Sequence, residues 1–316
     1  MSFYDYFQTT TVFVVSIQLV FGVFRWIYQN VIGPNFLEPT NLRRYGDWAL
    51  ITGATDGIGK EYTRQLAKRG LNIILVSRTA SKLKDVAKDI EETFNVRTDI
   101  IAVNFTSGIG IYDQIKQQII GKEIGILVNN VGMIYPSSPD LFLNIPNREK
   151  VIQEIVNCNI ISVPMMCSLI LPQMVQRKRG LIINISSIAS VLPSPSHTIY
   201  AASKAFVTKF SDDLGAEYGD QGIDVQSLIT GGVSTNMNKM VGAKIITPSA
   251  EDYVESALRY VGYARNTSGF LAHSLLTFAI QLVSFLAPTY AERLFKNMML
   301  AQRDESIKNG TYTPAK

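Results

Sequence analysis

Short apolar runs alternate along this chain with stretches whose apolar residues recur at helical spacing. The apolar runs, each expected to form a buried strand, are residues 48–51, 73–77, 99–103, 125–129, 181–185 and 225–229. The stretches expected to form helices are residues 60–69, 79–94, 109–120, 148–176 and 199–218. Strands that alternate with helices indicate βαβ units with right-handed crossovers. The predicted fold class is therefore α/β, a doubly wound parallel sheet.

An uncharged apolar stretch, residues 6–24, precedes this pattern. It is long enough to cross a bilayer as a helix, although Gln8 and Gln18 weaken the signal. Asp5 stands where a cleaved signal peptide would carry positive charge, so an anchor fits better than a signal. We expect residues 1–32 to form an N-terminal membrane anchor, with a buried helix as the alternative.

Basic residues follow the apolar stretch rather than precede it. Arg25, Arg43 and Arg44 all lie on its C-terminal side, and the positive-inside rule then places the rest of the chain in the cytosol. Residues 33–47 contain two prolines and several polar residues, which predicts a linker. The chain has four Asn-x-Ser/Thr sequons, which we interpret as chance because two lie in or beside predicted strands: Asn104, Asn184, Asn266 and Asn309.

The C-terminal part departs from the strand–helix pattern. Residues 230–266 are expected to be helical after an initial loop, and residues 270–287 form an apolar stretch without formal charge that ends at Pro288. This stretch could wall an apolar pocket, lie on a membrane or cross it; its length favours a pocket or an interface. We expect residues 271–316 to form an apolar helical extension whose polar tail, residues 303–316, is frayed.

Composition excludes several function classes. The 316 residues are 47% hydrophobic and 18% charged, with a net charge of +4, and no basic stripe interleaved with aromatic residues suggests nucleic acid binding. The mean hydropathy of +0.12 is high because of the two apolar stretches. Cys158 and Cys167 are expected to be buried thiols. His197 and His273 are too few for a histidine-rich metal centre, and they disfavour a Ser-His-Asp enzyme.

A glycine-rich turn follows the first predicted strand. Residues 52–59, TGATDGIG, lie between the strand at 48–51 and a helix. Glycines at such a turn allow a close approach of ligand, and the free N–H groups of the helix start suit a diphosphate. We therefore expect a dinucleotide cradle. Its residues are Gly53, Thr55, Asp56, Gly57, Ile58 and Gly59.

Four polar residues suggest a proton-transfer site. Tyr200 and Lys204, in YAASK, are four residues apart and share one face of a predicted helix. Ser187 follows the strand at 181–185, and Asn159 lies within the long predicted helix.

Taken together, these motifs resemble the short-chain dehydrogenase/reductase family over about residues 48–270. The turn matches the family's TGxxxGxG, the NNVG at residues 129–132 matches its NNxG, and the four polar residues match its Asn-Ser-Tyr-Lys tetrad. The resemblance implies a Rossmann domain that binds a nicotinamide cofactor. It implies that Asn130, Gly132, Tyr200 and Lys204 also contact that cofactor.

The implied reaction is carbonyl reduction. Tyr200 would give the substrate oxygen its proton, and the Lys204 ammonium together with the oxidised nicotinamide would lower the tyrosine pKa from ~10 by about 2–3 units. Ser187 would hydrogen-bond the substrate oxygen as charge develops there. In the family, the residue that matches Asn159 holds a water that links the lysine to solvent.

The residues after the second strand select the cofactor. Ser77, Arg78 and Thr79 include no acid for a ribose hydroxyl, and an arginine can pair with a 2′-phosphate, which predicts NADP(H). Asn104 stands where the family usually has the aspartate that meets the adenine. Thr230-Gly231-Gly232 replaces the usual Pro-Gly before Val233, whose backbone is expected to contact the nicotinamide carboxamide.

Several longer stretches resemble the membrane-bound branch that contains very-long-chain 3-oxoacyl-CoA reductases and 17-beta-hydroxysteroid dehydrogenases of types 3 and 12. They include residues 48–70, 123–133, 168–187 and 267–276. This branch implies an endoplasmic reticulum membrane with the catalytic domain in the cytosol, NADPH as cofactor, and a long-chain lipid or steroid ketone as substrate. It suggests a homodimer formed by the long helix and the Tyr200 helix, and contact with other enzymes of fatty acid elongation. The C-terminal dilysine of this branch is absent.

Three hypotheses therefore stand. The first is reduction of a 3-oxoacyl-CoA or a 17-oxosteroid; for the CoA phosphates, Lys239, Lys244 and Arg265 are candidate partners. The second is reduction of a retinoid or another lipid carbonyl. The third is a non-catalytic, membrane-anchored lipid-binding protein, which the intact tetrad argues against.

Overall fold

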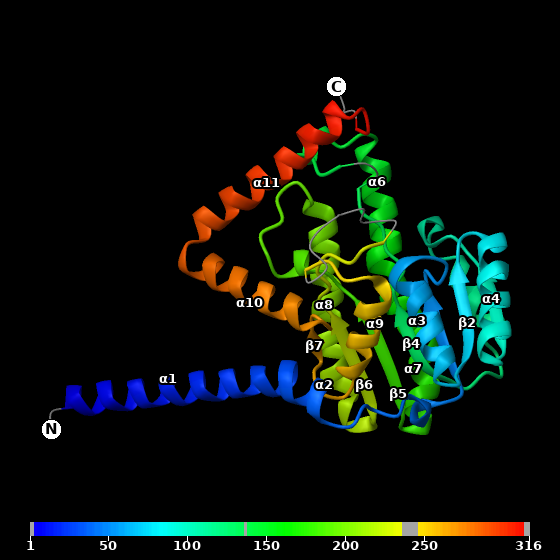
Figure 1. The fold of residues 1–316 in the computed structure, drawn as a ribbon, viewed down its shortest axis with the longest axis horizontal. Coiled ribbons are helices and arrows are strands. Elements are labelled where there is room, and N and C mark those ends of the chain that lie inside the picture. Colours follow the sequence, from blue (N-terminus) through cyan, green and yellow to red (C-terminus); the bar gives the residue numbers. More distant parts are fainter. Residues whose placement is uncertain (1–2, 136–137, 236–245, 313–316) are drawn as a thin grey trace.

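The computed structural model describes residues 3–135, 138–235 and 246–312. Its centre is a parallel sheet in the order β3-β2-β1-β4-β5-β6-β7 (Figure 1). The strands are β1 Trp48–Thr52, β2 Asn72–Ser77, β3 Thr98–Ala102, β4 Ile124–Asn129, β5 Gly180–Ile185, β6 Ile223–Leu228 and β7 Asn266–Thr267. The first six confirm the sequence prediction within two residues at each end. The edge strand β7 was not predicted, because two residues carry no periodic signal.

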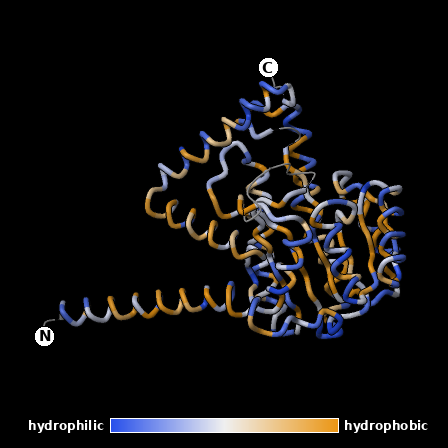
Figure 2. Tube along the Cα trace, in the orientation of Figure 1, coloured by the Kyte–Doolittle hydropathy of each residue, from blue (hydrophilic) through white to orange (hydrophobic). Residues whose placement is uncertain are grey.

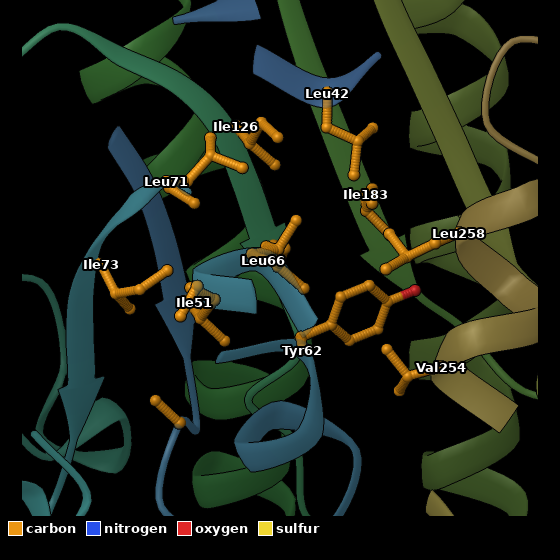
Figure 3. Packing of buried hydrophobic residues seen from close by; sticks show 14 of the residues in the cluster. Leu42, Ile51, Tyr62, Leu66, Leu71, Ile73, Ile126, Ile183, Val254 and Leu258 are labelled. Carbon is orange, nitrogen blue, oxygen red and sulfur yellow. The ribbon is translucent and has the colours of Figure 1, made fainter. Parts of the chain in front are cut away.

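Helices cover both faces of the sheet. One face carries α3 Gly57–Lys68, α4 Ala80–Phe94 and α9 Ala250–Arg259, and the other carries α5 Ile111–Gln118, α7 Ser162–Arg177 and α8 Thr198–Tyr218. Helix α6, Arg148–Ile155, buries Val151 and Ile155 in a separate small cluster with Tyr135 and Ile145. Successive strand residues alternate between the faces. Ile51 and Ile73 therefore pack under α3, where Tyr62 and Leu66 meet Val254 of α9 (Figure 3). The predicted doubly wound fold is confirmed.

The long helix predicted over residues 148–176 is interrupted. Between α6 and α7 the backbone forms a π-helical turn, Val156–Ile161. Pro164 follows this turn; it has no N–H to donate, and its ring crowds the carbonyl one turn earlier, so regular α-helical spacing is hard to keep here. Wide turns of this kind are frequent at functional sites, and this one contains Asn159.

The N-terminal segment stands away from the domain. Helix α1, Phe3–Ile27, extends as a lone rod (Figure 1), and the apolar window that makes it a candidate membrane span has none of its residues buried. A second candidate by composition, residues 148–177, is half buried in the described fold and belongs to the core. The segment expected as a linker contains the short helix α2, Gly33–Phe36, and is packed against the domain. Thr40 Oγ1 donates to the carbonyl of Val261 (2.8 Å).

The C-terminal residues form an arm of two helices. Helix α10, Leu271–Leu286, and helix α11, Pro288–Lys308, make a hairpin that projects beside the domain (Figure 1). A helical extension was expected here, but its division into two helices was not. The expected frayed tail is wrong for the residues described up to Tyr312. Arg303 and Tyr312 donate to the buried carboxylate of Asp140, at 3.0 and 2.7 Å. Burial acts to raise the pKa of Asp140, but these hydrogen bonds hold it below its usual value.

Helix α10 has the reverse of a normal amphipathic pattern. His273, Ser274 and Thr277 face the protein and are buried, whereas the exposed stripe is apolar: Leu271, Leu275, Phe278, Leu282 and Phe285. Figure 2 shows α1 and α10 as largely hydrophobic outside the domain. The two helices meet where the ring of Trp26 lies 6.0 Å from that of Phe278. The apolar face of this segment is turned away from the domain. Of the three interpretations, this arrangement fits a helix that lies on a membrane better than the wall of a pocket.

Candidate active site

The glycine-rich turn lies at the point where the strand order reverses, between β1 and β4. Ligands of open α/β sheets bind at this place, at the carboxyl ends of the strands. Gly53 and Gly57 have φ values of +68° and +52°, which favour glycine. At Gly59 a Cβ would lie 2.2 Å from the carbonyl oxygen of Gly53, so a side chain has no room there. Asp56 caps α3 by accepting a hydrogen bond from the Gly57 N–H (2.7 Å).

Asn130 supports this turn from β4. Its Nδ2 donates to the carbonyls of Thr52 (2.9 Å) and Gly53 (3.3 Å), and its backbone N–H donates to Thr52 Oγ1 (3.0 Å). The side chain therefore ties the ends of β1 and β4 together and fixes the glycine turn.

A cleft of about 580 Å³ opens over the turn. Predicted residues that line it are Gly53, Thr55, Asp56, Gly57, Ile58, Ser77, Arg78, Asn104, Asn130, Gly132, Tyr200 and Lys204. Four predicted residues do not line it: Gly59, Asn159, Ser187 and Val233. Val233 is buried in the core instead. The backbone turn, the helix start and the size of the cleft fit a dinucleotide.

Two cations lie at the end of the cleft beside β2. Arg78 is exposed there, and Lys82, in the first turn of α4, lines the same cleft. Sequence reasoning missed Lys82, because Arg78 precedes the N-cap Thr79 and no helical spacing relates the two residues. Asn104 Oδ1 already accepts from the N–H (3.2 Å) and the hydroxyl (3.1 Å) of Thr106. Both lone pairs of that oxygen are therefore engaged, which leaves it poorly suited to accept from an adenine amino group.

Tyr200, Ser187 and Lys204 converge at the opposite end. The Tyr200 hydroxyl is hydrogen-bonded to Ser187, and Ser187 Oγ also accepts from the Ala189 N–H (3.2 Å). Lys204 Nζ lies 5.8 Å from the centre of the Tyr200 ring and donates to the carbonyl of Ile185 (2.9 Å). Ser187 follows β5 and the other two lie on α8, so the end of one strand and one helix face bring them together.

The protein environment alone shifts the pKa values of Tyr200 and Lys204. Burial raises the pKa of Tyr200, and the hydrogen bond with Ser187 opposes that rise only in part. Burial also lowers the pKa of Lys204 to about 8, because the ammonium is almost entirely removed from water. The protein groups alone therefore keep Tyr200 protonated, and the expected lowering of its pKa by Lys204 together with the oxidised nicotinamide stays a prediction. A protonated phenol suits proton donation to a carbonyl oxygen.

Asn159 fixes the loop after β4. Its Oδ1 accepts from the Met133 N–H, and its Nδ2 donates to the Met133 carbonyl, both at 2.8 Å. The same Nδ2 donates to Ser203 Oγ (3.0 Å). Both amide protons of this buried side chain are therefore used, and a water that links it to Lys204 would have to donate to the second lone pair of Oδ1 or bind other atoms of the π turn.

Two aromatic residues beside Tyr200 were not predicted as site residues. The rings of Tyr135 and His197 stack at 5.8 Å, and His197 meets Tyr200 edge-on at 6.2 Å. Burial lowers the pKa of His197 to about 4, so the imidazole is neutral at physiological pH. The rings of Tyr135 and His197 therefore form an aromatic surface beside the Tyr200 ring.

The basic residues suggested for CoA phosphates are not brought to this site by the described fold. Arg265 packs on Gly215 and Gly219 at the C-terminal end of α8. That is about 22–28 Å along the helix from Tyr200, at ~1.5 Å per residue, and contact of Arg265 with CoA phosphates stays a prediction. Lys239 and Lys244 lie outside the described residues. Within the described residues, no group of three or more potential metal ligands is present.

Comparisons with known proteins agree with this geometry. The short chain dehydrogenase family pattern matches residues 47–245. The chain is 43% identical over 268 residues to a rat very-long-chain 3-oxoacyl-CoA reductase, covering 84% of each chain. It is 46% identical over 275 residues to human 17-beta-hydroxysteroid dehydrogenase type 3, covering 87% of each.

A solved structure of a short-chain dehydrogenase from Sphingobium yanoikuyae in complex with NADPH is also similar. It superposes with a TM-score of 0.61 and 26% identity, over 67% of this chain and 83% of that one. The sheet order, the glycine turn and the sequence identity agree, and the chain therefore belongs to the short-chain dehydrogenase family of oxidoreductases.

Proposed function

We propose that the protein reduces a long apolar ketone, a 3-oxoacyl-CoA or a 17-oxosteroid, with NADPH. The observation that carries the proposal is the meeting of Tyr200 and Ser187 beside a cleft built for a dinucleotide. The identities of 43% and 46% to relatives named for these two reactions support the substrate class.

Each side chain of the tetrad has a separate role in the proposed reaction. Bound NADPH supplies the hydride to the carbonyl carbon. Ser187 Oγ donates a hydrogen bond to the carbonyl oxygen, and Tyr200 delivers its phenolic proton to that oxygen as charge develops there. The Lys204 ammonium then stabilises the phenolate until it is reprotonated. Asn159 keeps the Met133 loop in place through two hydrogen bonds of 2.8 Å.

The charge at the β2 end of the cleft supports NADPH over NADH. Arg78 and Lys82 both line it, and a 2′-phosphate beside them would form charge-assisted hydrogen bonds. No acidic residue occurs between Ser77 and Lys82, where NAD enzymes usually hold the ribose with an acid.

We further propose that the protein sits on the cytosolic face of the endoplasmic reticulum membrane. Helix α1 is exposed and apolar, and α10 turns an uncharged apolar stripe away from the domain. With 16 residues, α10 is too short to cross a bilayer, so it would lie in the membrane surface. A bilayer-dissolved substrate explains this placement.

The expected homodimer remains a proposal. The outer face of α8 carries a stacked pair, Phe206 and Phe210, with ring centres 6.0 Å apart. Phe206 is 38% exposed, which supports a self-association surface there. Nothing in the described residues bears on contact with other elongation enzymes.

The test is turnover by the full chain purified in detergent. NADPH loss would be followed with long-chain 3-oxoacyl-CoA and, separately, with 17-oxosteroids. Tyr200→Phe is the matched control, because it removes only the hydroxyl. We expect consumption with one class and its loss in Tyr200→Phe. NADPH binding without turnover of either class would favour another lipid carbonyl; absence of NADPH binding would refute the enzyme proposal.

A further inference from the structure

A histidine of the C-terminal arm reaches the loop that borders the cofactor cleft. His273 lies in the first turn of α10 and is fully buried. Its ring is held between Phe270 and Tyr253, with ring centres 5.3 and 5.9 Å away. The aromatic contacts fix the ring's position, so its nitrogens point in defined directions.

Both ring nitrogens are hydrogen-bonded to backbone. Nδ1 lies 3.3 Å from the Gly231 nitrogen, and Nε2 lies 2.9 Å from the carbonyl oxygen of Ile246. An amide N–H only donates and a carbonyl only accepts, so the ring carries one proton, on Nε2. Burial lowers the pKa of His273, which favours the same neutral form.

The loop sequence is adapted to this ring. A Cβ on Gly231 would lie 2.8–3.0 Å from three ring atoms of His273. Gly231 does not have a positive φ, so glycine is needed here for space and not for backbone conformation. The loop lacks the proline that usually stiffens it in the family. The His273 bond and a bond from Thr230 Oγ1 to the Ser186 carbonyl (3.0 Å) supply restraint instead.

The restrained loop borders both the glycine turn and the part of the site that contains Ser187. Thr230 and Thr235 line the cofactor cleft, and a Cβ on Gly57 would lie 3.0 Å from Thr235 Cγ2. The Thr230 carbonyl accepts from the Ile188 N–H (2.8 Å), directly after Ser187. A shift of this loop would therefore change the space over the glycine turn.

We propose that His273 is a positioning residue: its neutral ring holds the Thr230–Thr235 loop against the cofactor cleft through the Gly231 N–H. The surface arm is thereby coupled to the cofactor site, although none of its residues is in the family tetrad. The proposal rests on the proposed function only in taking NADPH as the ligand.

Three substitutions of His273 test its hydrogen bonds to Gly231 and Ile246 separately. In His273→Asn the side-chain oxygen lies near the Nδ1 position and can still accept from Gly231. In His273→Gln the amide nitrogen reaches the Nε2 position and keeps only the bond to Ile246. His273→Leu loses both. NADPH affinity would be measured from its fluorescence with full-length protein in detergent.

We expect the Kd and KM for NADPH to rise about 5- to 10-fold in the Leu and Gln variants, because the partly buried Gly231 N–H loses its partner and the loop loses a restraint. At saturating NADPH, kcat should change much less. The Asn variant should remain within about 2-fold of wild type. Equal defects in Asn and Gln, or unchanged affinity in Leu, would overturn the proposal.

Hydrogen exchange without cofactor gives a second readout. Backbone amides of residues 229–235 should exchange faster in the Leu and Gln variants than in wild type or Asn. This result decides the positioning role even if wild type fails to bind NADPH, which would refute the proposed function alone. Unchanged exchange in the Leu variant would overturn the role of His273.

Discussion

Replacing Lys204 with methionine should stabilise the fold while abolishing reduction. The lysine is 5% exposed and is held by one hydrogen bond to the Ile185 carbonyl (2.9 Å). Methionine has a similar length and no charge, so it can occupy the same space without the cost of burying an ammonium.

The magnitude follows from the pKa. Burial lowers the pKa of Lys204 from 10.5 to about 8, and this difference, at ~1.36 kcal/mol per pH unit, corresponds to about 3 kcal/mol lost from folded-state stability at pH 7. The methionine variant also lacks the hydrogen bond to the Ile185 carbonyl, which lowers its stability by about 1 kcal/mol. We expect Lys204→Met to be more stable than wild type by roughly 2 kcal/mol at pH 7. Reduction should fall by about 10²–10⁴-fold.

The sign of the stability difference between Lys204→Met and wild type depends on pH. Between pH 8 and 10.5 the unfolded lysine binds more protons than the folded one, so wild-type stability rises with pH across this window. The advantage of methionine should therefore shrink above pH 8, vanish at pH ~9.5 and become a deficit of about 1 kcal/mol above pH 10.5, where only the lost hydrogen bond remains. Urea unfolding of the full chain in detergent, at pH 7 and pH 10, measures it. A methionine variant less stable than wild type at pH 7, or a difference independent of pH, would refute the reasoning.

Three further changes test other parts of the structure. Arg78→Glu should raise the KM for NADPH about 100-fold and leave that for NADH nearly unchanged, since a charged bidentate partner becomes repulsive; equal effects on both would contradict a phosphate contact. Arg303→Leu leaves the Asp140 carboxylate, 1% exposed, without its ionic partner and should cost about 3 kcal/mol in urea unfolding; Asp140→Asn in the same chain should restore part of the loss. The exposed sequon residues Asn266 and Asn309 should stay unmodified in cells, and a gel shift on endoglycosidase treatment would argue against a cytosolic domain.

Much of the fold could be predicted because it follows from local patterns. A buried parallel strand needs a continuous apolar run, and a covering helix needs apolar residues on one side. The six main strands and the helices between them carry both signals. The π turn at Asn159 was missed because periodicity averages over a wide window, although Pro164 marked the place.

Most of the named residues that line the cleft could be predicted, but Lys82, Tyr135, His197 and the contacts within the site could not. Spacing placed Tyr200 and Lys204 on one helix face. It could not show that Asn104 Oδ1 accepts two hydrogen bonds from Thr106, that Asn159 holds the Met133 backbone, or that burial raises the pKa of Tyr200. These depend on neighbours that are distant in sequence.

The sequence by itself determined the strand–helix order, the glycine turn and the positions of the four residues that match the family tetrad, because backbone sterics and hydrophobic periodicity act over a few neighbouring residues. Only the tertiary structure decided how the C-terminal arm is used. Asp140 meets Arg303 across 163 residues, and His273 meets Gly231 across 42. Such contacts form when packing brings distant segments together and buries polar atoms that must then find partners, which no local pattern specifies.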